Sequence, residues 1–599
     1  MQPNDQSPHS NSAVFSGPGD FKTTADLAPN GHMGGPQAPY SVDSEPSGNE
    51  KQQIRDEGER RVERPKSKFD IFGGIKYVWH THKLLCCLAI WLLITAYFIV
   101  SVALKKKTQL SDLLPFILLY AFISFKMLFA FVDTALVTKP MSKVYDSAVA
   151  QRVSRIPVKF LYMFGGAVLL ALVLGVSLGL PNSKNGNRGS RMQSLLGIVV
   201  ITALLVLTSR NPREIQWRTV IVGYLMQFCL GCIVIKTNWG NDLFNWIATR
   251  AADLLHFSHY GTEFLLGDEI ANIKGVFAIS VFPAIVFFAS FVQMIYYLGG
   301  MQWLLKRLGW FFQKSLDTSG AESIVAAASP FIGQSENVLL VKDYLEHMTN
   351  SEIHACMTAG FATISGSTLQ GYITLGVDPR NIITACIMSI PCSLALSKIR
   401  YPETEESLTR GKMVDPPKRT DEANILHALG NGAAVGINLS LLIAANLIAI
   451  ISLVNLVNFF LTWFGQFITI NELTLQLILS YLLYPYAWLL GVPKVDILKV
   501  SQLLGLKFIT NEFVAYMNLN GKDPLTGKSI ADTLTTRGHI IAEFSLCGFG
   551  NLGSIAQQIG ALGSLAPSRK ADFSRLALSA CITGSIATTL TAAIVSMVM

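Results

Sequence analysis

The chain has 599 residues, of which 50% are hydrophobic and 15% charged, and its mean hydropathy is +0.40. Soluble domains carry about 25% charged residues, so this composition excludes a soluble enzyme and indicates a polytopic membrane protein. The formal net charge is +8 and the basic residues lie mostly in short connections, which disfavours nucleic-acid binding.

The N-terminal part divides into a polar tail and three apolar spans. Residues 1–68 are rich in Pro, Gly, Ser, Asn and charged residues without sustained apolar periodicity, which predicts a disordered cytosolic tail. Apolar stretches follow at about 84–104, 113–137 and 157–180, each near the ~20 residues that a spanning helix needs. We expect three N-terminal transmembrane helices within residues 69–185.

Residues 186–320 combine further spans with two amphipathic segments. The spans lie at about 192–208, 217–235 and 273–299. In the segments Leu243–Leu255 and Trp303–Lys314, apolar side chains recur at helical spacing opposite charged ones. This pattern is typical of helices that lie along a membrane surface, so we expect scaffold helices accompanied by interfacial helices.

A first re-entrant hairpin is predicted at Ala321–Val341, an apolar segment broken by Pro330 and Gly333. It precedes a span at about 352–377 with polar residues in its middle, and then a span at about 381–399. We interpret residues 321–420 as the first hairpin and one half of a transport domain.

Residues 421–599 repeat this pattern. Leu473–Val492 is apolar, broken by Pro485 and ended by Gly491, so we expect the second hairpin there. The remaining spans lie at about 429–459, 499–519, 538–562 and 574–598. Interrupted apolar segments in corresponding halves are typical of a transporter's binding site. The expected fold is therefore all-α, with about eleven transmembrane helices and two re-entrant hairpins in an inverted repeat. Two kinked spanning helices are the alternative.

The distribution of basic residues predicts the orientation. Lys and Arg recur in alternate connections, which the positive-inside rule assigns to the cytosol. Lys105–Lys107 are an exception on the outer side. The balance favours a multi-pass protein with a cytosolic N-terminus.

One glycine pattern imitates a nucleotide site. Gly548-Phe-Gly550-Asn-Leu-Gly553 satisfies G-x-G-x-x-G, but that fingerprint needs a preceding strand and a βαβ unit. Here it lies within a spanning segment, where glycines allow close helix packing or an unwound backbone. We therefore expect a protein that is not an enzyme.

The most specific motif is Gly505-Leu-Lys-Phe-Ile-Thr-Asn-Glu-Phe-Val-Ala-Tyr516, which places a carboxylate inside an apolar segment. Such a carboxylate marks a substrate or ion path by default. The motif resembles the signature of the concentrative nucleoside transporter family, of eukaryotic and possibly fungal-like type. Residues 333–336, 357–367, 547–554 and 566–569 resemble the family as well, and the resemblance covers about 190–599.

The resemblance implies a nucleoside site, and its chemistry is reasonable without the family. Gln334 offers a donor and an acceptor to a base edge, and ionised Glu512 offers acceptors to ribose hydroxyls. For Glu336 and Glu512 the alternative is a buried pair with Lys342 or Lys507. The expected substrate-binding residues are Gln334, Ser335, Glu336, Thr368, Glu512, Phe549, Asn551 and Ser554.

The coupling ion is expected to be a proton, with sodium as the alternative and no other cofactor. In the family's sodium-driven members an Asn precedes the hairpin Gln by five residues, and here that residue is Ser329. Glu336 and Glu512, partly desolvated, could carry a proton instead. The expected ion-coupling residues are Ser329, Ile332, Thr363, Ile364, Glu336 and Glu512.

These features predict a proton-driven importer of purine or pyrimidine nucleosides in the plasma membrane, working by alternating access. The family implies a homotrimer, and nucleosides and membrane lipid are the expected partners, without nucleic acid. A sodium-coupled symporter is the first alternative, and a passive facilitator or channel is a more remote one. The paired hairpins disfavour a channel because they suit gates at two faces.

Overall fold

The computed structural model describes residues 83–104, 117, 120, 121, 123, 124, 157–182, 186–272, 276–415, 422–470, 473–521 and 529–599. The chain forms two compact units, residues 1–147 and 148–599, which are treated separately below. The expected tail over residues 1–68 and most of the expected span at 113–137 lie outside the described residues.

The first unit contains α3 (Lys83–Leu104), which matches the span expected at 84–104. Polar and ring contacts join this apolar helix to Tyr120 and Ser124. Trp91 Nε1 donates to Ser124 Oγ at 3.0 Å, and the Phe98 ring stacks on Tyr120 at 4.3 Å between centroids. These contacts hold Tyr120 and Ser124 against α3.

The second unit begins with the helices α7 (Val158–Gly179), α8 (Arg188–Leu207), α9 (Trp217–Lys236), α10 (Asn238–His256), α11 (Ser258–Leu266), α12 (Asp268–Ala271), α13 (Phe277–Tyr297) and α14 (Gly300–Leu316). Both amphipathic segments expected from the sequence are helical, as α10 and α14. Helices α13 and α14 meet at an angle of 83°. Within the described residues, six helices are long and apolar enough to cross a membrane, or seven if α13 and α14 form one broken span.

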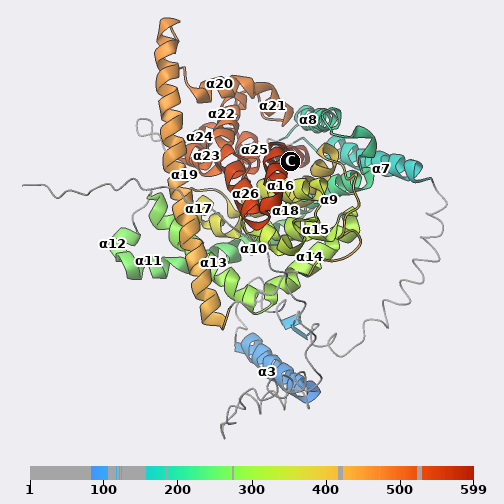
Figure 1. Ribbon diagram of the computed structural model, residues 1–599, viewed down its shortest axis with the longest axis vertical. Helices are drawn as coiled ribbons and strands as arrows, with labels where there is room; N and C mark the ends of the chain where they lie inside the picture. The colour runs from blue at the N-terminus through green and yellow to red at the C-terminus, as the bar shows by residue number, and fades with distance from the viewer. Residues whose placement is uncertain are drawn as a thin grey trace, which may run out of the picture. The chain divides into compact units, whose positions relative to one another are not determined.

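The longest element is α19 (Ile425–Phe467), which has 43 residues and is therefore about 64 Å long. In Figure 1 it runs along one side of the C-terminal helices and crosses α13, against which it packs. Glycines make this contact close. A Cβ at Gly432 would lie 2.5 Å from Ser290 Cα, and one at Gly436 would lie 2.6 Å from Val286 Cα. This small-xxx-small spacing lets two membrane helices approach at backbone distance.

The first hairpin forms where the sequence predicts it. Hairpin 1 consists of α15 (Gly320–Ala328), a turn over residues 329–336, and the 3₁₀ segment η3 (Asn337–Tyr344), which packs back on α15. The next span is broken into α16 (Asn350–Ala362), η4 (Gly366–Thr368) and α17 (Leu369–Thr374), and α18 (Pro379–Arg400) follows. We call residues 363–368 the first break.

The second half contains α20 (Leu475–Leu482), α21 (Tyr484–Leu489), α22 (Ile497–Ile509), α23 (Glu512–Asn520), α24 (Ile530–Thr533), α25 (Thr536–Leu546), α26 (Leu552–Leu565), η5 (Pro567–Arg569) and α27 (Lys570–Val598). Helices α22 and α23 pack against each other across Thr510 and Asn511, so we call them hairpin 2. Residues 547–551, between α25 and α26, are the second break.

Two expectations for this half were wrong. The hairpin predicted at Leu473–Val492 is formed later, by α22 and α23, and residues 499–519 are that hairpin rather than a span. The apolar segment is interrupted beside Pro485 as expected, between α20 and α21, with Pro485 in the first turn of α21, where a missing N–H costs nothing, but this interruption is not the hairpin turn. The arms α22 and α23 have 13 and 9 residues, too few for the ~20 that a span needs.

Helices α18 and α27 close the two halves and form the centre of the unit. In each, 89% of the apolar window is buried inside the protein. They pack on each other and on α16, α25 and α9. Each half therefore contains a hairpin, a broken span and a buried helix in the same order, as an inverted repeat requires.

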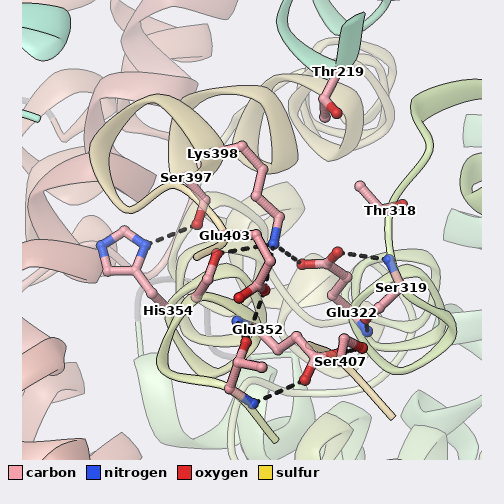
Figure 2. Close-up of polar contacts among 12 residues, drawn as sticks. Thr219, Thr318, Ser319, Glu322, Glu352, His354, Ser397, Lys398, Glu403 and Ser407 are labelled. Atoms are coloured by element: carbon pink, nitrogen blue, oxygen red, sulfur yellow. Dashed lines mark hydrogen bonds and ion pairs between the residues drawn. The ribbon is translucent and has the colours of Figure 1, made fainter. Parts of the chain in front are cut away.

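A buried polar cluster holds the base of hairpin 1 (Figure 2). Lys398 Nζ at the end of α18 lies 2.8 Å from Glu322 Oε2 on α15 and donates to Ser351 Oγ on α16 at 2.9 Å. It also lies 3.5 Å from Glu403 in the connection after α18. Glu352 accepts from Thr349 N and from Ser407 Oγ. One cation thus joins the beginnings of two helices to the end of a third.

Candidate functional site

One pocket collects side chains from both halves of the repeat. Its walls come from the turn of hairpin 1, the turn of hairpin 2, both breaks and the middle of α19. All eight residues expected to bind substrate line it, namely Gln334, Ser335, Glu336, Thr368, Glu512, Phe549, Asn551 and Ser554. The structure therefore brings together residues that lie up to 220 positions apart in the sequence (554 − 334).

The turn of hairpin 1 presents polar atoms to this pocket. Gln334 is buried, and its Nε2 donates to Gln557 Oε1 at 3.3 Å. Gln334 Oε1 and Ser335 Oγ are buried and have no hydrogen-bond partner among the described residues. Buried polar atoms are normally paired, so two unpaired ones lining a pocket indicate that a ligand completes them.

The turn of hairpin 2 positions Glu512. Asn511 is the N-cap of α23, its side chain accepting from Val514 N at 2.9 Å, and Glu512 is the first residue of that helix. The positive end of a helix dipole stabilises a carboxylate at this position. Tyr372 OH and Asn551 Nδ2 each donate to Glu512 at 3.1 Å. Its carboxylate is thus held rigid, with acceptor capacity remaining for a ligand.

The alternative of a Glu512–Lys507 pair is wrong, because Lys507 Nζ donates instead to the backbone oxygens of Ser545 and Cys547, where α25 ends. Lys342, the other basic residue considered, is exposed. The carboxylate of Glu512 is therefore held by hydrogen bonds rather than by an ion pair.

The second break positions Asn551 and Ser554. Gly548 has φ = 108°, a conformation that favours glycine, and this interrupts the helix at that residue. Asn551 is the N-cap of α26, and its Oδ1 accepts from Ser554 N at 2.8 Å. Phe549 N donates to Thr363 O at 3.2 Å, which joins the two breaks directly. The first two glycines of the G-x-G-x-x-G pattern, Gly548 and Gly550, therefore lie in an unwound segment beside the pocket, and the third lies in the first turn of α26.

Sequence reasoning missed several residues of this site. Gln557 pairs with Gln334, and Tyr372 orients Glu512. Asn446 and apolar side chains of α19 complete the wall. A signal existed for Gln557, which lies one helical turn beyond Ser554 on the same face of an apolar helix. Tyr372 gave none, since a lone Tyr in an apolar segment is ordinary packing.

The residues expected to couple an ion lie at the junction of hairpin 1 and the first break. Ser329 and Thr363 are buried, and each hydroxyl donates to a carbonyl one turn earlier, Val325 O at 2.8 Å and Ala359 O at 3.0 Å. Ile332 and Ile364 are buried in non-helical backbone. Hairpin 1 touches α16 closely here, because a Cβ at Gly360 would lie 3.2 Å from Gln334 Cβ.

An unexpected amide joins this junction. Asn337 is fully buried, and its Nδ2 donates to Ser329 Oγ at 2.9 Å. Its Oδ1 has no hydrogen-bond partner among the described residues. Ser329 stands at the position where the resemblance implies an amide in sodium-driven transporters. The Asn337 amide lies against that serine.

Comparisons with known proteins agree with this geometry. A family model for the C-terminal part of Na+-dependent nucleoside transporters matches residues 381–596, and one for their N-terminal part matches residues 196–269. A nucleoside-recognition model, named Gate, matches residues 278–378. Together the three models cover both hairpins, both breaks and α19.

Two curated relatives illustrate the similarity. Solute carrier family 28 member 3 of Eptatretus stoutii is 36% identical over 551 residues, which are 90% of this chain and 78% of that protein. Sodium/nucleoside cotransporter 1 of Homo sapiens is 38% identical over 71% of this chain and 66% of its own length.

Solved structures show the same fold. The structure of CNTnw in an inward-facing, substrate-bound state has a TM-score of 0.63 and 35% identity, and it covers 68% of this chain and 98% of CNTnw. A CNTnw variant in an outward-facing state has a TM-score of 0.64, with 69% of this chain covered. The fold of this chain is thus a polytopic membrane fold seen in inward-facing and outward-facing relatives.

Proposed function

We propose that this chain, which belongs to the concentrative nucleoside transporter family, imports nucleosides by secondary active transport coupled to sodium. Members of the family are secondary active carriers. What we propose for this chain beyond that is its sodium coupling, its site residues and its direction of transport. The observation that carries the proposal is the single pocket that contains all eight expected substrate residues together with two unpaired buried polar atoms.

The roles in substrate binding follow from the chemistry of the wall. Gln334 Oε1 accepts a hydrogen bond from the edge of a nucleobase, and Ser335 Oγ accepts or donates one there. Glu512 and Asn551 address the ribose, with the carboxylate accepting from vicinal hydroxyls. Phe549 offers apolar surface to the ring or sugar. Removing any one of the polar partners leaves buried groups unpaired, which makes the pocket selective for a ligand that satisfies all of them.

Sodium replaces the proton of our sequence-based expectation. The relatives described above include a sodium/nucleoside cotransporter, and the matching models describe Na+-dependent transporters. The absence of an amide at Ser329 was the reason to expect protons. Asn337 weakens that reason, because its unpaired Oδ1 belongs to an amide that lies within hydrogen-bond distance of Ser329.

The donor set suits sodium. Oxygen atoms of Ser329, Asn337 and Thr363, with the carbonyl groups of Ile332 and Ile364, would surround an ion at the junction of hairpin 1 and the first break. Unwound backbone carbonyls coordinate Na+ at comparable membrane sites. A bound cation there would hold hairpin 1 against the broken helix and so favour the conformation that binds substrate.

Further parts of the proposal rest on the family and on charge distribution. We place the protein in the plasma membrane with its N-terminus in the cytosol and as a homotrimer. The two hairpins serve as gates in an alternating-access cycle. A passive facilitator or channel is the competing function. Counterflow separates a carrier from a channel, since preloaded unlabelled uridine accelerates labelled uptake by a carrier and not by a pore. Accumulation against a uridine gradient separates a coupled carrier from a passive facilitator.

The test is uptake of labelled uridine and adenosine by nucleoside-uptake-deficient cells that express the chain. Sodium is replaced by choline at neutral and at mildly acidic external pH. Sodium coupling predicts that choline abolishes concentrative uptake at both pH values. Uptake that persists in choline and rises on acidification would restore the proton assignment, and uptake of no nucleoside would refute the proposal altogether.

A further inference from the structure

Lys507 is a buried cation within hairpin 2 that neither the substrate pocket nor an ion pair explains. It lies near the end of α22 and is only 1% exposed. Its Nζ donates to Ser545 O at 2.9 Å, Cys547 O at 3.0 Å and Thr588 Oγ1 at 3.3 Å. An ammonium group has three N–H donors, so these oxygens satisfy it completely without a carboxylate.

The two carbonyl oxygens are available because a helix ends there. Helix α25 ends at Leu546, and the second break separates it from α26. The last carbonyls of a helix have no partner within it and carry the negative end of its dipole. Thr588 Oγ1 donates its own proton to Ser585 O at 2.8 Å, so it offers a lone pair to Lys507. The ligand set is carbonyls at a broken helix and one hydroxyl.

The same kind of set surrounds the sodium position proposed for the first half. There α16 ends at Ala362 beside hairpin 1, and the hydroxyl groups of Ser329 and Thr363 lie at the junction. No buried lysine or arginine reaches that junction from its own hairpin. Between residues 320 and 368, all of which the structure describes, Lys342 is the only lysine or arginine, and it is exposed.

The two halves therefore differ at equivalent places. Each half has a hairpin packed on the C-terminal end of a broken helix, and each such end exposes oxygen atoms. In the first half the proposed exchangeable sodium ion supplies the positive charge. In the second half the positive charge belongs to the Lys507 ammonium group, which four methylene groups attach covalently to the backbone.

We propose that Lys507 is a tethered cation that occupies, in the second half of the repeat, the place that exchangeable sodium takes in the first. This inference rests on the proposed sodium coupling. It has two consequences. The contact between hairpin 2 and the second break persists when sodium leaves, so only hairpin 1 responds to the ion. With one exchangeable place per chain, each nucleoside is accompanied by one sodium ion.

The first test measures the sodium-to-uridine ratio of the unaltered protein in proteoliposomes, from initial fluxes of the two labelled solutes. We expect a ratio of one. A ratio of two in a transporter that requires sodium would overturn the inference while leaving the proposed function intact. Uridine transport without sodium would instead overturn the proposed function.

The second test compares Lys507→Ala with Lys507→Met. Alanine leaves a space lined by three oxygen atoms, whereas the methionine side chain fills much of that space with apolar atoms. We expect both variants to lose about tenfold or more of uridine transport, because hydrogen bonds to a charged group are lost. Added methylammonium should restore transport and raise the thermal unfolding midpoint of purified Lys507→Ala only.

The outcomes are decisive in both directions. Rescue of the alanine variant by methylammonium, absent in the methionine variant and absent with the larger choline ion, supports the tethered cation. Normal transport by Lys507→Met, or folded Lys507→Ala that methylammonium neither stabilises nor reactivates, overturns it. If the variants do not fold, the flux ratio of the unaltered protein still decides the question.

Discussion

Replacing Lys398 by methionine tests whether the cluster in Figure 2 fastens hairpin 1 to the rest of its half. Lys398 and Glu322 are each 2% exposed at the side chain and lie 2.8 Å apart. Methionine has a similar length but no charge, so Glu322 would remain buried without its cation. Glu322 Oε1 also accepts from Ser319 N at 2.6 Å.

The size of the effect follows from burial. Removing one partner of a buried ion pair costs about 3–5 kcal/mol, because the remaining charge loses its compensation. The double variant Lys398→Met with Glu322→Gln removes both charges and keeps an oxygen for Ser319 N. It should recover part of the loss, because Glu322 no longer carries an unpaired charge while Glu403, 7% exposed and 3.5 Å from Lys398, still lacks its cation.

The assay is the free energy of reversible unfolding in mixed detergent micelles, measured for the single and double variants. Lys306→Met is the matched control, because Lys306 pairs with Asp415 at side chains that are 53% and 75% exposed. An exposed pair contributes about 0–1 kcal/mol. If Lys398→Met costs no more than the control, or if the double variant is as unstable as the single one, the cluster does not fasten the hairpin.

Three further predictions concern the pocket, the ion junction and the α13–α19 contact. Glu512→Gln should raise the half-saturating uridine concentration about tenfold or more, because one carboxylate oxygen that accepts hydrogen bonds is replaced by an NH2 group. The control Glu405→Gln, at an exposed residue, should leave it unchanged. Equal kinetics of Glu512→Gln and the unaltered protein in an uptake assay would show that Glu512 does not bind substrate. Asn337→Ala should raise the half-saturating sodium concentration and leave uridine affinity at saturating sodium unchanged, as a sodium titration of uptake would reveal, with Asn455→Ala on α19 as the control. Gly436→Ala should destabilise the protein by about 1–3 kcal/mol, because the added Cβ would clash with Val286. The control Gly430→Ala, whose Cβ meets nothing within 4 Å, should be neutral or stabilising. Thermal unfolding that ranks the two variants the other way would contradict this packing.

Hairpin 1 and residues that line the pocket could be predicted from the sequence because their signals are local. Pro330 and Gly333 interrupt an apolar segment at the turn itself, and Gln334 and Glu336 follow within it. Glu512 was equally visible, as a carboxylate surrounded by apolar residues. Polar residues in apolar segments are costly unless they serve a purpose, so they mark sites even without a structure.

The remaining features depend on contacts between distant segments, or on residue types such as proline that occur both at hairpin turns and at helix starts. Pro485 marks the break between α20 and α21, which is not the turn of a hairpin, and the turn of hairpin 2 at Thr510 and Asn511 contains neither Pro nor Gly. The partners of Lys507 and the orphaned oxygen of Asn337 follow from packing between segments far apart in the chain. Periodicity reports which faces are apolar and not which oxygen atoms meet a given side chain.

Accumulation of labelled uridine by purified protein in liposomes, under an imposed inward sodium gradient, tests the central claim most directly. The account predicts that internal uridine rises transiently above the external concentration, that the rise disappears when sodium is equal on both sides, and that Glu512→Gln abolishes it. Equilibration without accumulation under the sodium gradient would contradict coupled transport, and undiminished accumulation by Glu512→Gln would contradict the assigned site.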